Sequence, residues 1–271
     1  MVIDVHTHAF PDTIAERTLE FLKAKMLAQS NIKVPNNTDG TVDGLLRSMD
    51  KCGVDISLVM PIATKISQTN TINNFAENLR GERILSFGSV HPHDSDACDV
   101  LKDLASRGGM GIKLHPEFQD FYIDSKESLK VLKCAEELGL SVLIHAGGDL
   151  GYPPPYHCTP ERLEHVLGEI SGEKLIAAHL GGFMMWDEVL KRIAGKPIYI
   201  DTAAVGTCIT PDIYHDIIRA HGADRVLFGS DSPWESQSHA LEVLESTGIT
   251  KEELDKIKYE NAVKLFGLKK L

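Results

Sequence analysis

The chain has 271 residues, of which 42% are hydrophobic and 25% charged, as in ordinary soluble globular proteins. Its 39 acidic residues outnumber the 28 basic ones, giving a net charge of −11, and an acidic surface repels nucleic-acid phosphates. No apolar run approaches the ~20 residues that span a bilayer, and the first residues include acidic side chains where a signal peptide is apolar. We therefore expect a cytoplasmic protein with neither nucleic acid nor membrane as a partner.

Short apolar stretches alternate along the chain with stretches of helical periodicity. Strands are predicted at residues 2–5, 56–60, 84–90, 111–115, 141–145, 174–179, 198–201 and 226–231. Helices are predicted at residues 13–27, 42–51, 71–79, 97–107, 126–138, 160–170, 184–193 and 211–220, followed by two more at 240–244 and 251–266. Thr159 before Pro160 is a typical helix start, and Thr250 with Glu253 has the spacing of a capping box.

Strict alternation of eight strands and helices, with no change of composition along the chain, predicts an α/β fold. We expect residues 1–271 to form a single (β/α)8 TIM-barrel domain with extra C-terminal helices. An open doubly wound sheet is the alternative that alternation alone permits. Two long loops, residues 29–40 and 147–159, are expected near the rim, where they could form a lid.

Ionisable residues are placed where predicted strands end. Asp4, His6 and His8 follow each other with period two along the first strand, which predicts that all three point to the same side. The fourth, fifth, sixth and eighth strands end at His115, His145, His179 and Asp231. Catalytic residues of (β/α)8 barrels lie at the carboxyl ends of the strands. The first and eighth strands are neighbours in a closed barrel but not in an open sheet, so this pattern favours the barrel.

The expected cofactor is one divalent metal ion. In a closed barrel His6, His8, His145 and Asp231 can converge, and three imidazoles with one carboxylate suit Zn²⁺, or else Fe²⁺, Mn²⁺ or Co²⁺. The five cysteines include no CxxC pair, so neither a disulfide framework nor a thiolate zinc site is indicated.

The chain resembles the amidohydrolase superfamily over nearly its whole length. The resemblance is carried by His6-Thr-His8, by His145 after SVLI, by His179 in AHLGG and by Asp231 in FGSDSPW. More narrowly, these motifs resemble its amidohydrolase-related branch, which includes aminocarboxymuconate-semialdehyde decarboxylase. The resemblance implies a (β/α)8 barrel with one metal held by His6, His8, His145 and Asp231. It also implies that His179 is a catalytic histidine beside that metal.

Further residues are candidates for substrate binding. Lys113, in GIKLHP, has three open roles: a carbamylated metal ligand, a cation for a substrate carboxylate, or the partner of a carboxylate such as Asp4. We favour the last two. His115, His91 and Trp234 are also assigned to the substrate, although His91 lies next to Pro92, which breaks a regular strand.

The sequence thus predicts an enzyme for a small-molecule substrate, with Asp231 and His179 as catalytic residues. The first hypothesis is a metal-dependent hydrolase acting on an amide, lactone or ester, in which Asp231 carries the proton. The alternative is a metal-dependent nonoxidative decarboxylase of a small unsaturated or aromatic carboxylic acid. A remote alternative is a non-catalytic barrel with a structural zinc. Homo-oligomerisation is the default expectation for such an enzyme.

Overall fold

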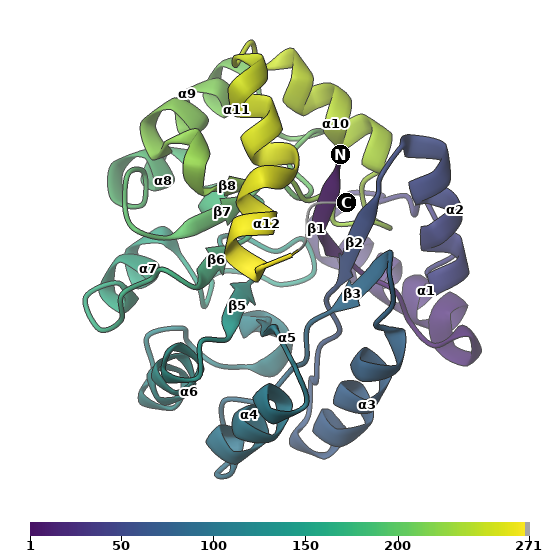
Figure 1. Ribbon diagram of the computed structural model, residues 1–271, viewed down its shortest axis with the longest axis vertical. Helices are drawn as coiled ribbons and strands as arrows, with labels where there is room; N and C mark the ends of the chain where they lie inside the picture. Colours follow the sequence, from purple (N-terminus) through teal and green to yellow (C-terminus); the bar gives the residue numbers. More distant parts are fainter. Residues whose placement is uncertain (269–271) are drawn as a thin grey trace.

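The computed structural model describes residues 1–268 and shows eight parallel strands in the centre of a ring of helices (Figure 1). The strands are β1 (Ile3–Thr7), β2 (Ile56–Val59), β3 (Ile84–Ser86), β4 (Gly111–Leu114), β5 (Ser141–Ile144), β6 (Leu175–Ala177), β7 (Tyr199–Asp201) and β8 (Val226–Leu227). The predicted (β/α)8 barrel is confirmed, and the open doubly wound sheet is not what the chain forms.

The ring of strands consists of two sheets joined at both edges. One sheet has the order β1-β2-β3 and the other β4-β5-β6-β7-β8. A parallel bridge pairs Thr7 with Ser232 and another pairs Gly88 with Ile112. Backbone hydrogen bonds from Val5 to the Phe228 carbonyl, and from Gly88 to Gly111, add to these bridges. Strands one and eight are therefore neighbours, as the convergence of their polar residues requires.

Twelve α-helices are described within residues 1–268, and two of them lie between β1 and β2. They are α1 (Asp12–Ser30), α2 (Val42–Cys52), α3 (Thr69–Leu79), α4 (Ala97–Ser106), α5 (Pro116–Gln119), α6 (Lys126–Glu137), α7 (Pro160–Val166), α8 (Trp186–Arg192), α9 (Pro211–His221), α10 (Gln237–Ser246), α11 (Lys251–Asp255) and α12 (Asn261–Phe266). Short 3₁₀ turns η1 (Ile66–Gln68), η2 (His179–Gly181) and η3 (Ala223–Arg225) and a π turn η4 (Lys256–Glu260) complete the set.

Several helices start where the sequence predicts them to. The Thr159 hydroxyl accepts a hydrogen bond from the backbone N–H of Arg162 at the start of α7, with Pro160 in the first turn. Thr250 and Glu253 form the predicted capping box of α11. These contacts satisfy N–H groups that the first helical turn leaves without a partner.

All strands except β1 are shorter than predicted, and β4, β5, β6 and β8 end before the polar residues that were expected to end them. Strands β4, β5 and β6 end one or two residues before His115, His145 and His179, and β8 ends four residues before Asp231. The ionisable residues therefore stand on the first residues of the loops that follow the strands. Irregular backbone there lets each side chain take its own direction instead of alternating across the sheet.

The apolar core has two layers. Inside the barrel lie Ile3, Val5, Ile56, Leu58, Phe87, Leu143, Ile176 and Leu227. A larger cluster fills the space between the strands and the helices, and it includes Val142, Ile144, Ala177, Ile200 and Val226. Successive residues of β5, Val142 and Leu143, thus face opposite layers, as the alternation of a strand requires.

An irregularity in β1 changes the direction of one predicted site residue. From Asp4 to Thr7 the strand advances three residues while its partner β2 advances two, from Ser57 to Val59. This is a β-bulge, which interrupts the alternation of side chains. Asp4 hydrogen-bonds to Ser230 and to Gln237 of α10. The prediction that Asp4 faces the same side as His6 and His8 is therefore wrong.

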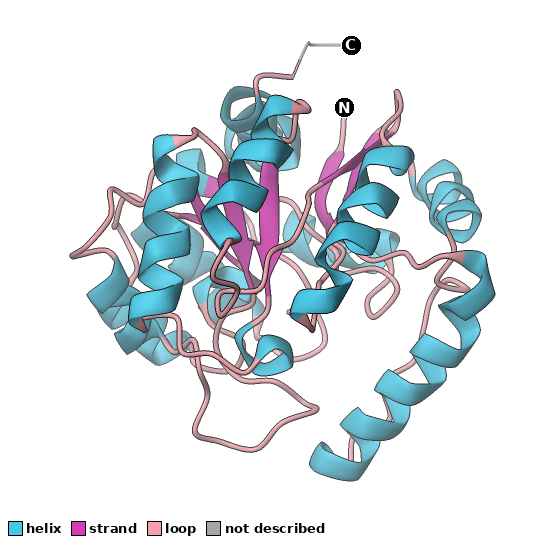
Figure 2. Cartoon of the chain, turned by 90° about the horizontal axis from the view of Figure 1, so that it is seen from below, coloured by secondary structure: helices cyan, strands magenta, loops and turns pink. Residues whose placement is uncertain are grey.

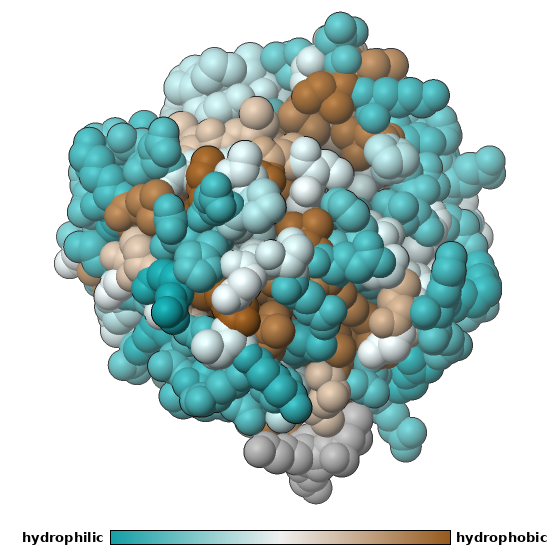
Figure 3. Space-filling model, turned by 90° about the horizontal axis from the view of Figure 1, so that it is seen from above, coloured by the Kyte–Doolittle hydropathy of each residue, from teal (hydrophilic) through white to brown (hydrophobic). Residues whose placement is uncertain are grey.

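The N-terminus and helix α1 lie at opposite ends of the barrel. Figure 2 shows the N-terminus at one end and α1, the longest helix, extending at the other. The face in Figure 3 carries hydrophilic residues around small, separate hydrophobic patches. Within residues 1–268, no helix combines the length and apolar character needed to cross a membrane.

Candidate metal centre and active site

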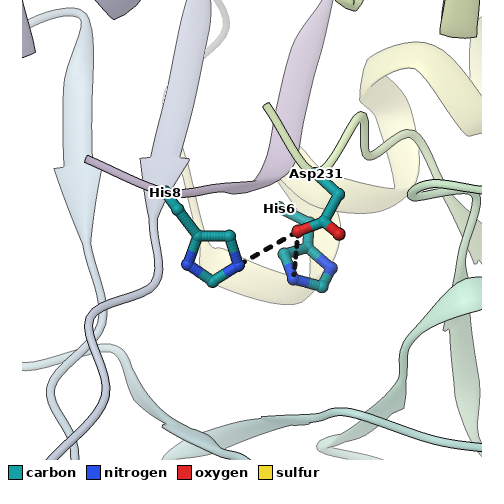
Figure 4. Close-up of side chains that lie close together, drawn as sticks. All are labelled: His6, His8 and Asp231. Carbon is teal, nitrogen blue, oxygen red and sulfur yellow. Dashed lines mark ion pairs between the residues drawn. The ribbon is translucent and has the colours of Figure 1, made fainter. Parts of the chain in front are cut away.

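Three predicted ligands meet at the mouth of the barrel. Asp231 Oδ1 lies 3.0 Å from His8 Nε2 and 3.4 Å from His6 Nε2 (Figure 4). His6 is almost completely buried, whereas the side chains of His8 and Asp231 are 13% and 12% exposed. These atoms lie within 4.8 Å of one another, close enough to bind one ion together. We call His6, His8 and Asp231 the ligand trio.

The fourth predicted ligand, His145, belongs to a different compact group. His145 Nε2 lies 3.8 Å from Asp149 Oδ2, and His115 Nε2 lies 3.5 Å from the same oxygen. These three residues form a second set whose ligand atoms lie within 4.8 Å of one another. Asp149 was not singled out from the sequence, because it lies in a loop five residues beyond β5.

His145 connects this second group to the predicted catalytic histidine. His145 Nδ1 and His179 Nε2 are 3.0 Å apart. His179 Nδ1 lies 2.8 Å from the Ala203 carbonyl, and His145 Nε2 lies 2.9 Å from the Gly148 carbonyl. A carbonyl oxygen only accepts, so both outer nitrogens carry the ring protons. The two inner nitrogens then face each other with lone pairs.

The protonation state of the His145 and His179 rings indicates whether a cation fits beside them. Burial, followed by the charge of Lys113, lowers the pKa of His145 to about 4. Burial and the neighbouring His145 lower the pKa of His179 to about 4. Both rings are therefore neutral at pH 7, and two lone pairs at 3.0 Å repel each other unless a cation lies close to them. The donor set, with free ring nitrogens and a carboxylate, fits a divalent transition-metal ion.

Asp201, at the end of β7, orients two of the histidines. Its Oδ2 accepts a hydrogen bond from His6 Nδ1 at 2.9 Å, which leaves His6 Nε2 free to face Asp231. Its Oδ1 accepts from the backbone N–H groups of His179 and Ala203 at 2.9 and 3.0 Å. Histidines that bind metals commonly donate their second nitrogen to a carboxylate. The sequence signal was present, since Asp201 also ends a predicted strand, but no role was assigned to it.

Lys113 points into the barrel against His6, one of the predicted metal ligands. Its Nζ lies 3.0 Å from His6 Nε2, and only 1% of the residue is exposed. Burial lowers the pKa of Lys113 to about 8. The suggested partner Asp4 is instead bonded to Ser230 and Gln237, so that pairing is wrong.

The backbone is unusual at two of the catalytic candidates. His179 and Asp231 have φ angles of 59° and 64°, in the left-handed region that residues other than glycine rarely occupy. Such conformations cost free energy and persist where surrounding contacts impose them, commonly at functional sites. The Asp231 N–H donates to the His6 carbonyl at 2.8 Å, which ties the two strand ends together.

The pKa values of the site's carboxylates are shifted in different directions. Burial alone would raise the pKa of Asp231, but the adjacent His6 and His8 rings hold it below its ordinary value. Burial raises the pKa of Asp149 and of Asp201. Asp231 is therefore the carboxylate most strongly held in its ionised form, as expected for a group that binds a cation.

The remaining substrate candidates differ in how close the structure places them to the site. His115 lies beside Asp149 and His145, within the site. Trp234 follows the site residue Asp231, and its backbone N–H donates to the Asp231 carbonyl at 2.9 Å. His91 makes its contacts locally, accepting from the backbone N–H of His93 at 3.3 Å. His115 thus contacts residues of the site. Within the described residues, the contacts of His91 do not connect it to the site.

Comparison with known proteins identifies the family. A model of the amidohydrolase family matches residues 3–268. The chain belongs to this family. No curated protein sequence matches this amidohydrolase.

Solved structures share the fold over the whole length of the amidohydrolase. A 5-carboxyvanillate decarboxylase from Sphingomonas paucimobilis has 15% identity and a TM-score of 0.71, covering 99% of each chain. A dihydroxybenzoic acid decarboxylase from Polaromonas with bound manganese has 16% identity and a TM-score of 0.69, covering 100% of this chain and 98% of that one. A probable 2-pyrone-4,6-dicarboxylic acid hydrolase from Acinetobacter baumannii has 17% identity and a TM-score of 0.65, covering 98% and 99%.

Proposed function

We propose that this amidohydrolase is a metal-dependent nonoxidative decarboxylase of a small aromatic or unsaturated carboxylic acid. The observation that carries the choice of reaction is the set of similar structures, which includes decarboxylases of 5-carboxyvanillate and of dihydroxybenzoic acid over the full chain length. The sequence alone ranked hydrolysis first, and the comparisons support the alternative better. Hydrolysis is the second candidate, because the same set includes a probable pyrone dicarboxylic acid hydrolase.

The proposed cofactor is one divalent ion held by the ligand trio together with His145. The inner lone pairs of His145 and His179, 3.0 Å apart, support a cation close to these rings. When bound, such an ion would supply positive charge against the negative charge that develops on a reacting acid. Zinc is the ion expected from the ligand types, and manganese is the ion bound in one similar decarboxylase.

The chain's own residues have separable proposed roles. Loss of CO2 leaves an electron pair on carbon, and a proton must take the place of the lost group. We assign this proton transfer to Asp231, which would take a proton from water at the partly exposed mouth and pass it to that carbon; Asp231 Oδ1 lies 3.0 Å from His8 Nε2. The Nδ1–H group of His179 donates a hydrogen bond to the Ala203 carbonyl, so Nε2 stays free to accept a hydrogen bond. The Lys113 ammonium attracts the substrate carboxylate.

Product analysis tests the proposed reaction. Protein loaded with Zn²⁺ or Mn²⁺ is incubated with a panel of hydroxybenzoic and unsaturated acids in D2O, and separately with lactones and amides in ¹⁸O-labelled water. We expect release of CO2 and one deuterium on the carbon that carried the carboxylate. Hydrolysis of a lactone with ¹⁸O incorporation, and no CO2 from any acid, would establish the second candidate instead.

A further inference from the structure

A row of ring systems leads from the candidate metal centre to helix α1. The His145 ring stacks on His115 with centroids 4.3 Å apart, and His115 stacks on Phe118 at 3.8 Å. Tyr152 is tilted against Phe118 at 5.6 Å. Lys25 Nζ lies 3.4 Å from the centre of the Tyr152 ring. We call His115, Phe118 and Tyr152 the ring row, and Lys25 stands at its outer end.

The ring row is assembled from separate segments that pack against one another. Phe118 lies in α5, a short helix that starts directly after His115, and its backbone N–H donates to His115 Nδ1 at 3.4 Å. Both faces of the His115 ring are covered, by His145 and by Phe118. Phe118, Tyr152 and Lys25 are all partly exposed. The rings are already packed against one another, so a ligand that binds beside them need not order them.

Lys25 carries a charge that acts on the carboxylate of Asp149 and helps to lower the pKa of that group, but no ion pair holds its ammonium group. No carboxylate within residues 1–268 forms an ion pair with Lys25, whereas Lys23, on the same helix, pairs with Glu20 at 2.6 Å. Lys25 Nζ lies over the face of Tyr152 and is 5.7 Å from the centre of Phe118. An ammonium group has three donors, and a contact with a ring face leaves donors free for an anion.

We propose that Lys25, Phe118 and Tyr152 form the distal end of the substrate site and select a flat unsaturated acid that carries a second anionic group. The reacting carboxylate lies at the ligand trio, and the second anionic group lies at the other end of the molecule, against Lys25. The proposed function underlies this assignment, because it places the reacting group at the metal. The partly exposed edges of Phe118 and Tyr152 would supply apolar surface for the flat body, and Lys25 would supply the charge that recognises its far end.

Two matched ligands test the role of the charge. Terephthalate has a carboxylate at each end of a benzene ring, and 4-carbamoylbenzoate replaces one carboxylate with a neutral amide of the same shape. Binding of each to metal-loaded protein is measured by calorimetry. We expect the native protein to bind terephthalate about tenfold more tightly, and Lys25→Met to lose this preference. Lys23→Met is the matched control and should keep it.

Other ligands and variants separate recognition of the second anion from other roles. Phthalate, whose two carboxylates are adjacent, should bind Lys25→Met as well as it binds the native protein. Tyr152→Leu should weaken both terephthalate and 4-carbamoylbenzoate while leaving some preference between them. Equal binding of the two matched ligands by the native protein, or a preference that survives in Lys25→Met, would overturn the proposal. A change in the thermal stability of Lys25→Met with an unchanged ligand preference would also overturn it, because the contact of Lys25 with the ring row would then only stabilise the position of α1.

A separate measurement distinguishes failure of this proposal from failure of the proposed function. Benzoate, with a single carboxylate, is titrated into protein with and without Mn²⁺. Metal-dependent benzoate binding supports the metal-based function whatever Lys25 does. Metal-independent binding, together with a terephthalate preference that depends on Lys25, would support anion recognition by Lys25 and contradict placement of the first carboxylate at the metal.

Discussion

Replacing Asp201 with asparagine is expected to weaken metal binding while the protein stays folded. Asp201 Oδ1 accepts hydrogen bonds from the backbone N–H groups of His179 and Ala203, and an asparagine oxygen can keep both. Oδ2 accepts from His6 Nδ1 at 2.9 Å. In the variant an amide N–H group faces that nitrogen instead, so His6 must move its proton to Nε2. That nitrogen is the one facing Asp231, and once protonated it cannot bind a cation.

The size of the effect follows from the contact that is lost. Removing a group that orients a metal-binding histidine typically lowers metal affinity 10- to 100-fold, or about 1.4 to 2.8 kcal/mol. Calorimetric titration of metal-free protein with Zn²⁺ and Mn²⁺ measures this loss, and thermal unfolding of the metal-free forms checks the fold. Asp201→Asn with native metal affinity would refute the role assigned to this carboxylate.

The chain offers a matched control for this experiment. Asp4 is as fully buried as Asp201, but its side chain bonds to Ser230 and Gln237 and to no histidine ring. Its Oδ1 accepts from the backbone N–H of His6 at 3.2 Å, a bond that an asparagine oxygen can keep. Asp4→Asn therefore removes a buried charge at a similar position in the barrel without changing a ligand. We expect it to alter stability and leave metal affinity unchanged. Equal loss of metal from both variants would show that burial of charge, and not the contact with His6, sets the affinity.

Further predictions concern the ligands, the proton and the buried lysine. Asp231→Asn should lower kcat about 10²–10⁴-fold with little change in substrate binding, as steady-state kinetics and calorimetry would show. His6→Ala should lose the metal by elemental analysis, whereas His179→Asn should keep it and lose most of the rate; equal metal loss would make His179 a ligand. Lys113→Met should stabilise metal-free protein at pH 7 by about 3 kcal/mol, because a pKa lowered from 10.5 to about 8 costs stability as pH falls through that window. The stability difference, measured by denaturant unfolding, should disappear above about pH 10.5, and a difference independent of pH would contradict this origin. Chelation should abolish activity and leave the circular dichroism spectrum nearly unchanged, since the core is built without the metal.

The barrel and the position of its site could be predicted because both depend on regular patterns. Alternating apolar strands and amphipathic helices specify the fold, and polar residues after successive strands mark one end of the barrel. The structure places His6, His8 and Asp231 together as that pattern indicates. The single-domain assignment and the roles of the site residues stay predictions.

What the sequence did not reveal depends on irregular backbone. The bulge in β1 adds one residue between Asp4 and Thr7, and no periodicity rule detects an insertion of that size. Helix α5 has four residues, too few for a helical period to appear, yet it carries Phe118 to the site. Asp149 lies in a loop after β5, and its position depends on how that loop folds back toward His145. Such features require tertiary contacts that a single sequence does not display.

The bulge in β1 also determines the dielectric environment of the ligands. Val5 belongs to the apolar cluster inside the barrel, and His6, its neighbour in sequence, faces the same interior against Lys113 and Asp201. In a regular strand these neighbours would point to opposite sides. Apolar side chains therefore begin directly beneath the ligand trio, in which His8 and Asp231 are partly exposed. Charges in such a one-sided environment are weakly screened, so a single ionic substitution there changes the local potential far more than the same substitution at the surface.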